Sequence, residues 1–165
     1  MSSTSSVDAS ASESVKQAPF FPRWFIRSAW FIHRAIYNVS GGRLGLRPVT
    51  EQTWGMMRLK TVGRKSGKQR VAILGYFEDG PNLVTLAMNG WGAPEPAWWL
   101  NLQARPDTVV EIAGAGWRAV HGRVATADER PRLWARWGEY NGKHFEAWAK
   151  RRPGETAVVI LEPRD

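Results

Sequence analysis

The sequence predicts a mainly β protein with helices (α+β), built as a small barrel of antiparallel strands. Short strand-like segments separated by turn signals follow one another at close spacing through residues 55–161. Helical segments are inserted near the middle and the end rather than after every strand, which favours a barrel over a βαβ sheet. A chain of 165 residues, 43% of them apolar, fits one domain with a sizeable core.

Six strands are expected, and turn residues set their ends. The first two flank a turn hinged by Gly63 and Gly67, and the third follows the Asp-Gly-Pro-Asn turn at residues 79–82. The fourth and fifth form a hairpin across residues 114–116, and a Gly/Pro-rich loop occupies residues 89–96. The expected strands cover residues 55–62, 71–77, 83–88, 108–112, 117–125 and 156–161.

Three helices are expected after the first strands. The first, residues 97–104, begins after Pro96, a favoured first-turn residue, and ends before Pro106. Thr-Ala-Asp-Glu at residues 126–129 has the spacing of a capping box, so a second helix is expected to start there. A third is expected at residues 143–150.

The N-terminal region predicts a tail and a helix. Residues 1–19 are Ser/Ala-rich and polar, and we expect a disordered tail without a signal peptide, followed by a single domain at residues 20–165. Residues 22–39 predict an amphipathic helix with an arginine stripe, which can pack on the protein's own core or lie on an anionic membrane. No apolar run approaches the roughly 18 residues of a membrane span. We therefore expect a cytoplasmic protein, with peripheral contact at the inner face of the cell membrane as an alternative.

Charge and composition restrict the chemistry. The chain has 23 Lys and Arg against 15 Asp and Glu, a net charge of +8, which indicates an anionic partner such as nucleic acid, phospholipid or a phosphorylated small molecule. The absence of cysteine excludes disulfides, thiol catalysis and iron–sulfur clusters, and no metal site is expected. Ten tryptophans indicate either large aromatic cores or a surface that stacks on flat ligands.

The most informative motif is the basic turn at residues 61–70, Thr-Val-Gly-Arg-Lys-Ser-Gly-Lys-Gln-Arg, and no Asp or Glu occurs within residues 52–77. The cations of the turn are Arg64, Lys65, Lys68 and Arg70. Guanidinium groups chelate phosphate or carboxylate oxygens, and the two glycines let backbone N–H groups approach an anion. The turn therefore predicts an anion site, with a solvated basic turn as the alternative. It is not a Walker A motif, because the glycines are one residue too close and Gln69 stands where Ser or Thr is required.

The turn and its surroundings resemble the deazaflavin-dependent nitroreductase family, whose members use coenzyme F420. The resemblance rests on Gly-Arg-Lys-Ser-Gly at residues 63–67 between two strands and on Pro-Ala-Trp-Trp-Leu-Asn-Leu at residues 96–102, and it extends over residues 38–163. It implies a split β-barrel. It also implies an oxidoreductase that transfers a hydride from reduced F420 to an electron-poor acceptor, such as a quinone, enone or nitro compound.

The resemblance also implies which residues meet the cofactor. The phosphate and acidic tail would lie along Arg64, Lys65, Ser66 and Arg70. The deazaflavin ring would sit near Val71, Ala72 and Ile73 and near the turn formed by Ala87, Met88 and Asn89. Trp98, Trp99 and Asn101 would help close the groove.

Substrate contacts are expected on the last helical region. Relatives active on nitroimidazoles carry tyrosines there, and the nearest matches are Phe145 and Trp148, with Tyr140 upstream as a candidate proton donor. Relatives also carry a tyrosine where Gly75 stands. Hydride transfer from a deazaflavin requires neither a nucleophile nor a metal, which agrees with a chain that has three scattered histidines.

Other interpretations remain open. Related split barrels bind FMN, so FMN is an alternative cofactor, and a non-catalytic deazaflavin carrier is an alternative function. A nucleic-acid-binding barrel is less favoured, because the basic residues cluster in one turn instead of following a groove. The expected partners are a small-molecule hydride acceptor and no nucleic acid, in a monomer or homodimer.

Overall fold

A computed structural model of the chain describes residues 45–89, 95–150 and 152–165. The chain divides into two units, Met1–Ile36 and Tyr37–Asp165, and all the described residues belong to the second. The predicted tail at residues 1–19, the amphipathic helix at residues 22–39 and most of the loop at residues 89–96 lie outside the described residues.

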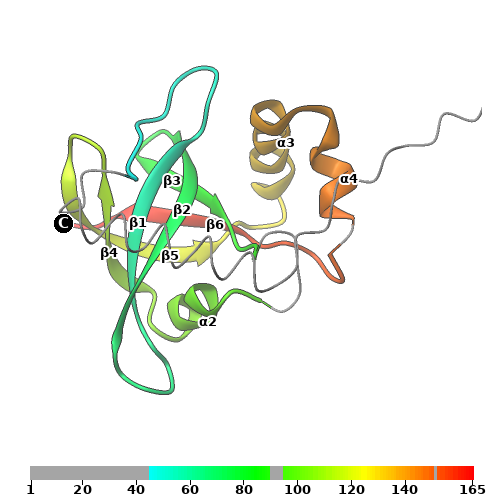
Figure 1. The fold of residues 1–165 in the computed structure, drawn as a ribbon. Helices are drawn as coiled ribbons and strands as arrows, with labels where there is room; N and C mark the ends of the chain where they lie inside the picture. The colour runs from blue at the N-terminus through cyan, green and yellow to red at the C-terminus, as the bar shows by residue number, and fades with distance from the viewer. Residues whose placement is uncertain (1–44, 90–94, 151) are drawn as a thin grey trace, which may run out of the picture. The chain divides into compact units, whose positions relative to one another are not determined.

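Antiparallel strands of the described chain form a closed barrel in the order β1–β2–β3–β6–β5–β4, and β4 pairs back onto β1 (Figure 1). The strands are β1 Gly55–Val62, β2 Gln69–Asp79, β3 Asn82–Leu86, β4 Asp107–Ile112, β5 Gly116–Val124 and β6 Val158–Pro163. Each of these strands pairs with a neighbour on both sides, but β2 meets β3 only through Phe77, Glu78 and Asp79, and β1 meets β4 only through Arg58 and Leu59. The predicted fold class, a mainly β barrel with a few helices, is confirmed.

One hydrophobic cluster fills the barrel. Buried and half-buried positions alternate along β1, because successive side chains of a strand point to opposite faces. The inward side chains include Met57, Leu59, Leu74, Tyr76, Val110 and Leu161. The helix α2, Ala97–Ala104, lies at one end of the barrel (Figure 1), where Leu102 is fully buried against Gly122.

A second cluster lies between the strands and the C-terminal helices. The helices are α3, Arg130–Asn141, the short 3-10 helix η1, Gly142–His144, and α4, Phe145–Ala149. The helices lie together on one side of the barrel (Figure 1). Seven side chains of this cluster are at most 3% exposed: Phe77, Val84, Leu133, Trp137, Phe145, Val158 and Ile160. Side chains on one face of β2, β3 and β6 thus pack in the first cluster, and side chains on the other face pack in the second.

The strand ends differ from the prediction for reasons of hydrogen bonding. β2 extends two residues further at each end, because its pairing with β1 reaches Gln69 and its pairing with β3 reaches Asp79. β3 ends at Leu86, because the N–H of Met88 turns back to the Leu86 carbonyl at 2.9 Å. β6 lies two residues later than expected, since it pairs with β5 as far as Pro163. The last predicted helix is shorter, because η1 occupies its start.

The predicted capping box forms and joins α3 to the barrel. The N–H of Thr126 donates to Glu129 Oε2 at 2.8 Å, and the N–H of Glu129 donates to Thr126 Oγ1 at 3.3 Å. Arg123 on β5 binds both carboxylate oxygens of Glu129, at 2.7 and 2.8 Å, and also Glu162 on β6 at 2.7 Å. The Arg123 guanidinium, followed by the Thr126 N–H, lowers the pKa of Glu129 to about 2.

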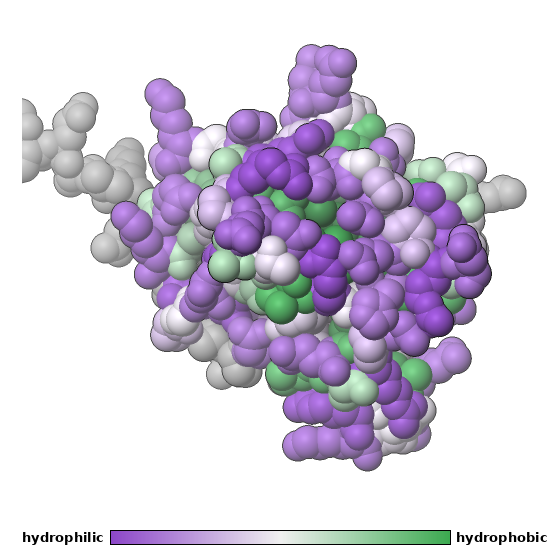
Figure 2. Space-filling view, turned by 180° about the vertical axis from the view of Figure 1, so that it is seen from behind, coloured by the Kyte–Doolittle hydropathy of each residue, from purple (hydrophilic) through white to green (hydrophobic). Residues whose placement is uncertain are grey.

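Most large apolar side chains lie in the two clusters. The face shown in Figure 2 is mainly hydrophilic, and its hydrophobic side chains form small separate patches. Among the described residues, Val71, Trp117 and Val124 are the large apolar side chains that are exposed. No helix within the described ranges has both the length and the apolar character needed to cross a membrane.

We predict that Glu129→Gln weakens the protein at neutral pH but not in strong acid. A carboxylate whose pKa is lowered on folding stabilises the fold above its unfolded pKa, near 4.5, and this stabilisation disappears as the pH falls through about 2. The melting temperatures of wild type and variant should differ by a constant amount above pH ~5 and converge toward pH 2. A difference that persists unchanged at pH 2 would contradict this account.

We also predict that Gly122→Ala destabilises the barrel by about 1–3 kcal/mol. A Cβ at this position would lie 2.5 Å from Leu102 Cδ2 and 2.8 Å from its Cγ, so α2 or β5 must shift. Gly138→Ala is the matched control, because its Cβ would meet Phe145 Cδ1 at an ordinary 3.6 Å within α3. Urea unfolding should show Gly138→Ala to be neutral or stabilising by up to ~1 kcal/mol.

Candidate cofactor site

The basic turn joins β1 to β2 and holds its shape through its own hydrogen bonds. The Gly63 N–H donates to the Lys68 carbonyl at 2.9 Å, and the N–H groups of Ser66 and Gly67 donate to the Gly63 carbonyl at 3.2 and 2.8 Å. The Lys68 N–H donates to Ser66 Oγ at 3.4 Å. These backbone donors are engaged within the turn, so recognition of an anion falls mainly to side chains. The N–H groups of Gly63, Ser66, Gly67 and Lys68 are therefore not free to bind an anion.

The two glycines of the turn serve different purposes. Gly67 has a φ of 64°, in the left-handed region that glycine adopts most readily. At Gly63 the constraint is space, because a Cβ would lie 2.7 Å from Ser66 Oγ and 3.3 Å from the Lys68 carbonyl oxygen. A side chain at position 63 would therefore separate the hydrogen-bonded ends of the turn.

The four cations of the turn are exposed, and none of them has an acidic partner among the described residues. The salt bridges among the described residues involve other basic side chains: Arg58, His121, Arg123, Arg130, Arg132, Arg152 and Arg164. Within the same ranges no ion pair is formed by Arg64, Lys65, Lys68 or Arg70. Uncompensated positive charge of this kind raises the local concentration of anions, and guanidinium groups bind phosphate and carboxylate strongly.

Asn101 on α2 holds the start of this turn. Its side chain is buried, and Oδ1 accepts a hydrogen bond from the Arg64 N–H at 3.1 Å. Its Nδ2 donates to Thr61 Oγ1 at 3.4 Å. The sequence suggested that Asn101 helps to close the groove. The structure gives it a positioning contact with the turn.

The outward residues of β2 form a row that leads away from the turn. Val71 is 48% exposed, Ile73 and Gly75 are half-buried, and Phe77 is fully buried beneath the C-terminal helices. From Val71 to Gly75 the row spans about 13 Å, and the Trp54 ring lies over its Gly75 end. Ala72, predicted as a ring contact, is 7% exposed and belongs to the cluster inside the barrel. It reaches the outer face only through its backbone.

Two of the three residues predicted to meet the ring in the turn after β3 are accessible, and the third is buried. Ala87 is fully buried, and its N–H donates to the Ala157 carbonyl at 2.9 Å. Its carbonyl accepts a hydrogen bond from Arg152 at 2.7 Å. Met88 is half-buried and Asn89 is exposed. Ala87 is therefore the fixed residue from which Met88 and Asn89 extend.

Trp54 covers the far end of the β2 row, and it was not among the residues predicted from the sequence. A Cβ at Gly75 would lie 3.0 and 3.2 Å from two carbons of the Trp54 ring and 3.5 Å from Trp137. Arg47 fixes this ring, because its Nη2 donates to the Trp54 carbonyl at 2.7 Å and its guanidinium carbon lies 5.0 Å from the ring centre. The signal that could have revealed it is a glycine inside a strand, which often marks the close approach of another group.

Trp98 and Trp99 close the end of the barrel. They are 9% and 6% exposed, and their rings meet edge to face at 6.2 Å. Both belong to the cluster inside the barrel. Their indoles therefore contribute mainly to the support of α2.

Tyr140 belongs to a group of neighbouring aromatic rings that also contains Phe77, Trp137 and Trp54. Its ring is half-buried and lies 5.9 Å from Phe77 and 6.5 Å from Trp137. Trp137 in turn lies 6.5 Å from Trp54. The indole Nε1 of Trp137 is buried without a hydrogen-bond partner among the described residues.

The two predicted pocket residues of the last helix differ in exposure. Trp148 is half-buried, and its ring stacks on His144 at 5.9 Å. Phe145 is 1% exposed, and its ring lies 4.7 Å from Trp134. Phe145 therefore supports the helices from within the core and presents no surface to a ligand as the helices stand.

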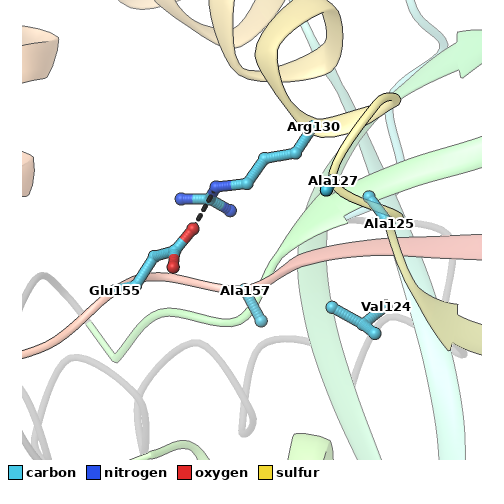
Figure 3. A pocket seen from close by; sticks show the side chains of 6 residues that line it. All are labelled: Val124, Ala125, Ala127, Arg130, Glu155 and Ala157. Atoms are coloured by element: carbon cyan, nitrogen blue, oxygen red, sulfur yellow. Dashed lines mark ion pairs between the residues drawn. The ribbon is translucent and has the colours of Figure 1, made fainter.

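A separate cavity of about 340 Å³ lies where α3 meets the ends of β5 and β6 (Figure 3). It is lined by Val124, Ala125, Ala127, Arg130, Glu155 and Ala157. Arg130 and Glu155 form an ion pair beside it. No residue of the predicted cofactor site lines it, so its volume is not evidence for that site. The described residues contain no group of three or more potential metal ligands.

The barrel, its basic turn and the open β2 row define a class of split-barrel proteins that bind a flat, anionic cofactor. Solved structures share the fold. One, described as "Structure of F420-H2 Dependent Reductase (FDR-A)", has a TM-score of 0.55 at 22% identity and covers 72% of this chain and 100% of its own. Another, described as a "domain-swapped dimer", has a TM-score of 0.59 at 21% identity and covers 82% and 99%.

Residues 30–163 match the family described as F420H(2)-dependent quinone reductase, and the chain belongs to that family. It is 29% identical over 135 residues to the F420H(2)-dependent quinone reductase Rv1261c of Mycobacterium tuberculosis, across 81% of this chain and 89% of the relative. It is 38% identical over 105 residues to Rv3178 of the same organism, across 61% and 83%. The protein is therefore an oxidoreductase whose cofactor is coenzyme F420, as the resemblance implied.

We predict that Asn101→Ala loosens the basic turn. The substitution leaves the Arg64 N–H and the Thr61 hydroxyl without this partner, which should cost about 1–3 kcal/mol. Hydrogen exchange at the Arg64 amide should accelerate more than exchange in β4 and β5. The control is Asn141→Ala, because Asn141 Nδ2 donates to the Trp137 carbonyl at 2.8 Å within α3. Equal acceleration at Arg64 in both variants would argue against the contact.

Proposed function

We propose that this protein transfers a hydride from reduced coenzyme F420 to a quinone. The observation that carries the proposal is an exposed cation cluster, without acidic partners in the described part of the chain, at the head of an apolar row on β2. A cofactor with a flat ring and a phosphorylated acidic tail matches both parts of this surface. When bound, reduced F420 supplies the hydride, and the protein supplies binding, orientation and electrostatics.

The tail end of the proposed site is the basic turn. Arg64 and Arg70 can bind phosphate or carboxylate oxygens through two parallel N–H groups, and Lys65 adds a point charge. Ser66 offers its hydroxyl at the same turn. Asn101 contributes by fixing the Arg64 backbone, and Trp98 and Trp99 by holding α2.

The ring end of the proposed site is the outer face of β2. Val71 and Ile73 form an apolar floor, with the backbone of Ala72 between them. Met88 and Asn89 border this floor after β3. A rigid floor matters because hydride transfer requires the reacting carbons to be held near contact distance with little freedom.

The acceptor side of the proposed site is aromatic. Trp54 and Tyr140 are half-buried rings at the end of the floor, and Trp148 is a further candidate on α4. Such rings stack on a planar quinone and exclude water from the reacting face. The Tyr140 hydroxyl is a candidate proton donor to the reduced product, with water as the other source. Enones and nitro compounds are further electron-poor acceptors for the same surface.

The proposed assembly and location follow from weaker observations. One solved structure with this fold is described as a "domain-swapped dimer", which supports a homodimer over a monomer. Sedimentation at several concentrations tests this. A quinone substrate makes contact with the cytoplasmic face of a membrane plausible for residues 22–39, which liposome binding before and after deletion of residues 1–40 would test.

We predict that Arg64→Ala or Lys65→Ala weakens F420 binding by about ten- to a hundredfold, because each removes a charge-assisted hydrogen bond of about 1.5–3 kcal/mol. Titration of cofactor fluorescence measures this. Lys143→Ala is the matched control, since Lys143 is an exposed cation in η1 outside the turn. Equal affinity in all variants would refute the tail assignment. Wild type should oxidise F420H2 with menadione, and binding without turnover across quinones would instead indicate a carrier.

A further inference from the structure

Arg152 is a buried cation that joins two separate parts of the chain. Its side chain is 3% exposed. Nη1 donates to the Ala87 carbonyl at 2.7 Å and to Thr156 Oγ1 at 3.1 Å, and Nη2 binds Glu95 Oε1. A buried guanidinium is unfavourable unless it is paired, so these contacts determine how the surrounding chain must fold.

The contacts of Arg152 bracket the residues that follow β3. Ala87 precedes Met88 and Asn89, and both of its backbone polar groups are engaged, by Arg152 and Ala157. Glu95 precedes Pro96, whose carbonyl accepts the first backbone hydrogen bonds of α2. One guanidinium therefore holds both the turn at the ring end of the proposed site and the start of α2.

The other end of the proposed site has its own attachment. α2 is packed into the barrel by Leu102 and holds the basic turn through Asn101. Loss of the Arg152 contacts would therefore release the turn at residues 87–89 while the tail end keeps its support. This separation makes the role of Arg152 distinguishable from general stabilisation.

We infer that Arg152, with Glu95, is a positioning residue for the reductase, because it fixes the turn that carries Met88 and Asn89, two residues of the proposed ring site. This inference rests on the proposed function. It assigns Arg152 no contact with the cofactor or the acceptor. Its effect is to set the position of the ring relative to the acceptor, and a displacement of about 1 Å can lower a rate by a hundredfold.

The test compares Arg152→Met with Arg123→Met. Both variants remove a guanidinium that binds carboxylate and backbone groups. Arg123, however, lies on β5 and binds Glu129 before α3, away from the contacts that Arg152 makes with Ala87 and Glu95. Steady-state rates with F420H2 and menadione are measured at a temperature well below both melting transitions. Arg152→Met should lower kcat about ten- to a hundredfold. The Kd for F420 should change by less than about threefold, because the tail contacts are intact. Arg123→Met should lose melting temperature and keep kcat.

Two further variants make the result decisive. Glu95→Ala, at a residue whose side chain is 38% exposed, leaves the Arg152 guanidinium in place and should reduce kcat in the same direction. It should also lower the melting temperature, because the buried guanidinium loses its carboxylate partner. Asn101→Ala should show the opposite pattern, a raised Kd with kcat kept at saturating cofactor. The limiting fluorescence of bound F420 should differ from that of wild type in the Arg152 and Glu95 variants and in neither of the other two. Unchanged kcat in those variants, or equal losses in Arg123→Met, would overturn the inference. A wild type that does not bind F420 would instead overturn the proposed function.

Discussion

The two-residue period of β2 is the constraint on which the rest of this molecule depends. Ala72, Leu74 and Tyr76 enter the barrel, so the alternate residues must face outward. Along that outer row exposure falls from Val71 to Phe77, because the C-terminal helices cover only the far end. A single strand thus supports two cores and leaves one open floor between the basic turn and Trp54. A shift of one residue in the pairing register of β2 would turn its core side chains outward and its outer side chains into the barrel.

Two buried polar side chains hold irregular segments near this floor. Asn101 binds the basic turn, and Arg152 binds the turn after β3. Each pairs with backbone groups of its turn. Apolar packing alone is non-directional and could not fix these turns at defined positions. A few hydrogen bonds therefore fix the positions of these turns, whereas strand pairing and core packing fix the positions of the strands.

Local signals in the sequence were sufficient for the strands, for α2 and for the capping box, because periodicity, turn residues and cap spacing act over short distances. The basic turn was also recognisable, since four cations lie within seven residues. Arg152 and Trp54 were not recognisable, because their partners Ala87 and Gly75 lie 65 and 21 residues away and only the closed barrel brings them together. Phe145 shows the opposite case. Its place in the sequence predicted a substrate contact, but the fold of η1 and α4 buries its side chain. Asn101 was predicted to help close the groove, and only the structure shows its hydrogen bonds to the Arg64 N–H and to Thr61.

The distribution of charge favours a small anionic ligand over a nucleic acid. Among the described residues six arginines are paired with carboxylates, and four cations without such a partner there lie close together in the basic turn. A short cluster of this kind suits a small anion better than the extended track that a nucleic acid needs. Trp117, the exposed indole, is covered by Lys60 at 4.0 Å and Arg58 at 4.9 Å from its ring centre. A ring occupied by cations is not free to stack on a base. Among the half-buried rings of the described chain, Trp54 and Tyr140 belong to the aromatic group at the end of the β2 row, beside the proposed position of the hydride acceptor.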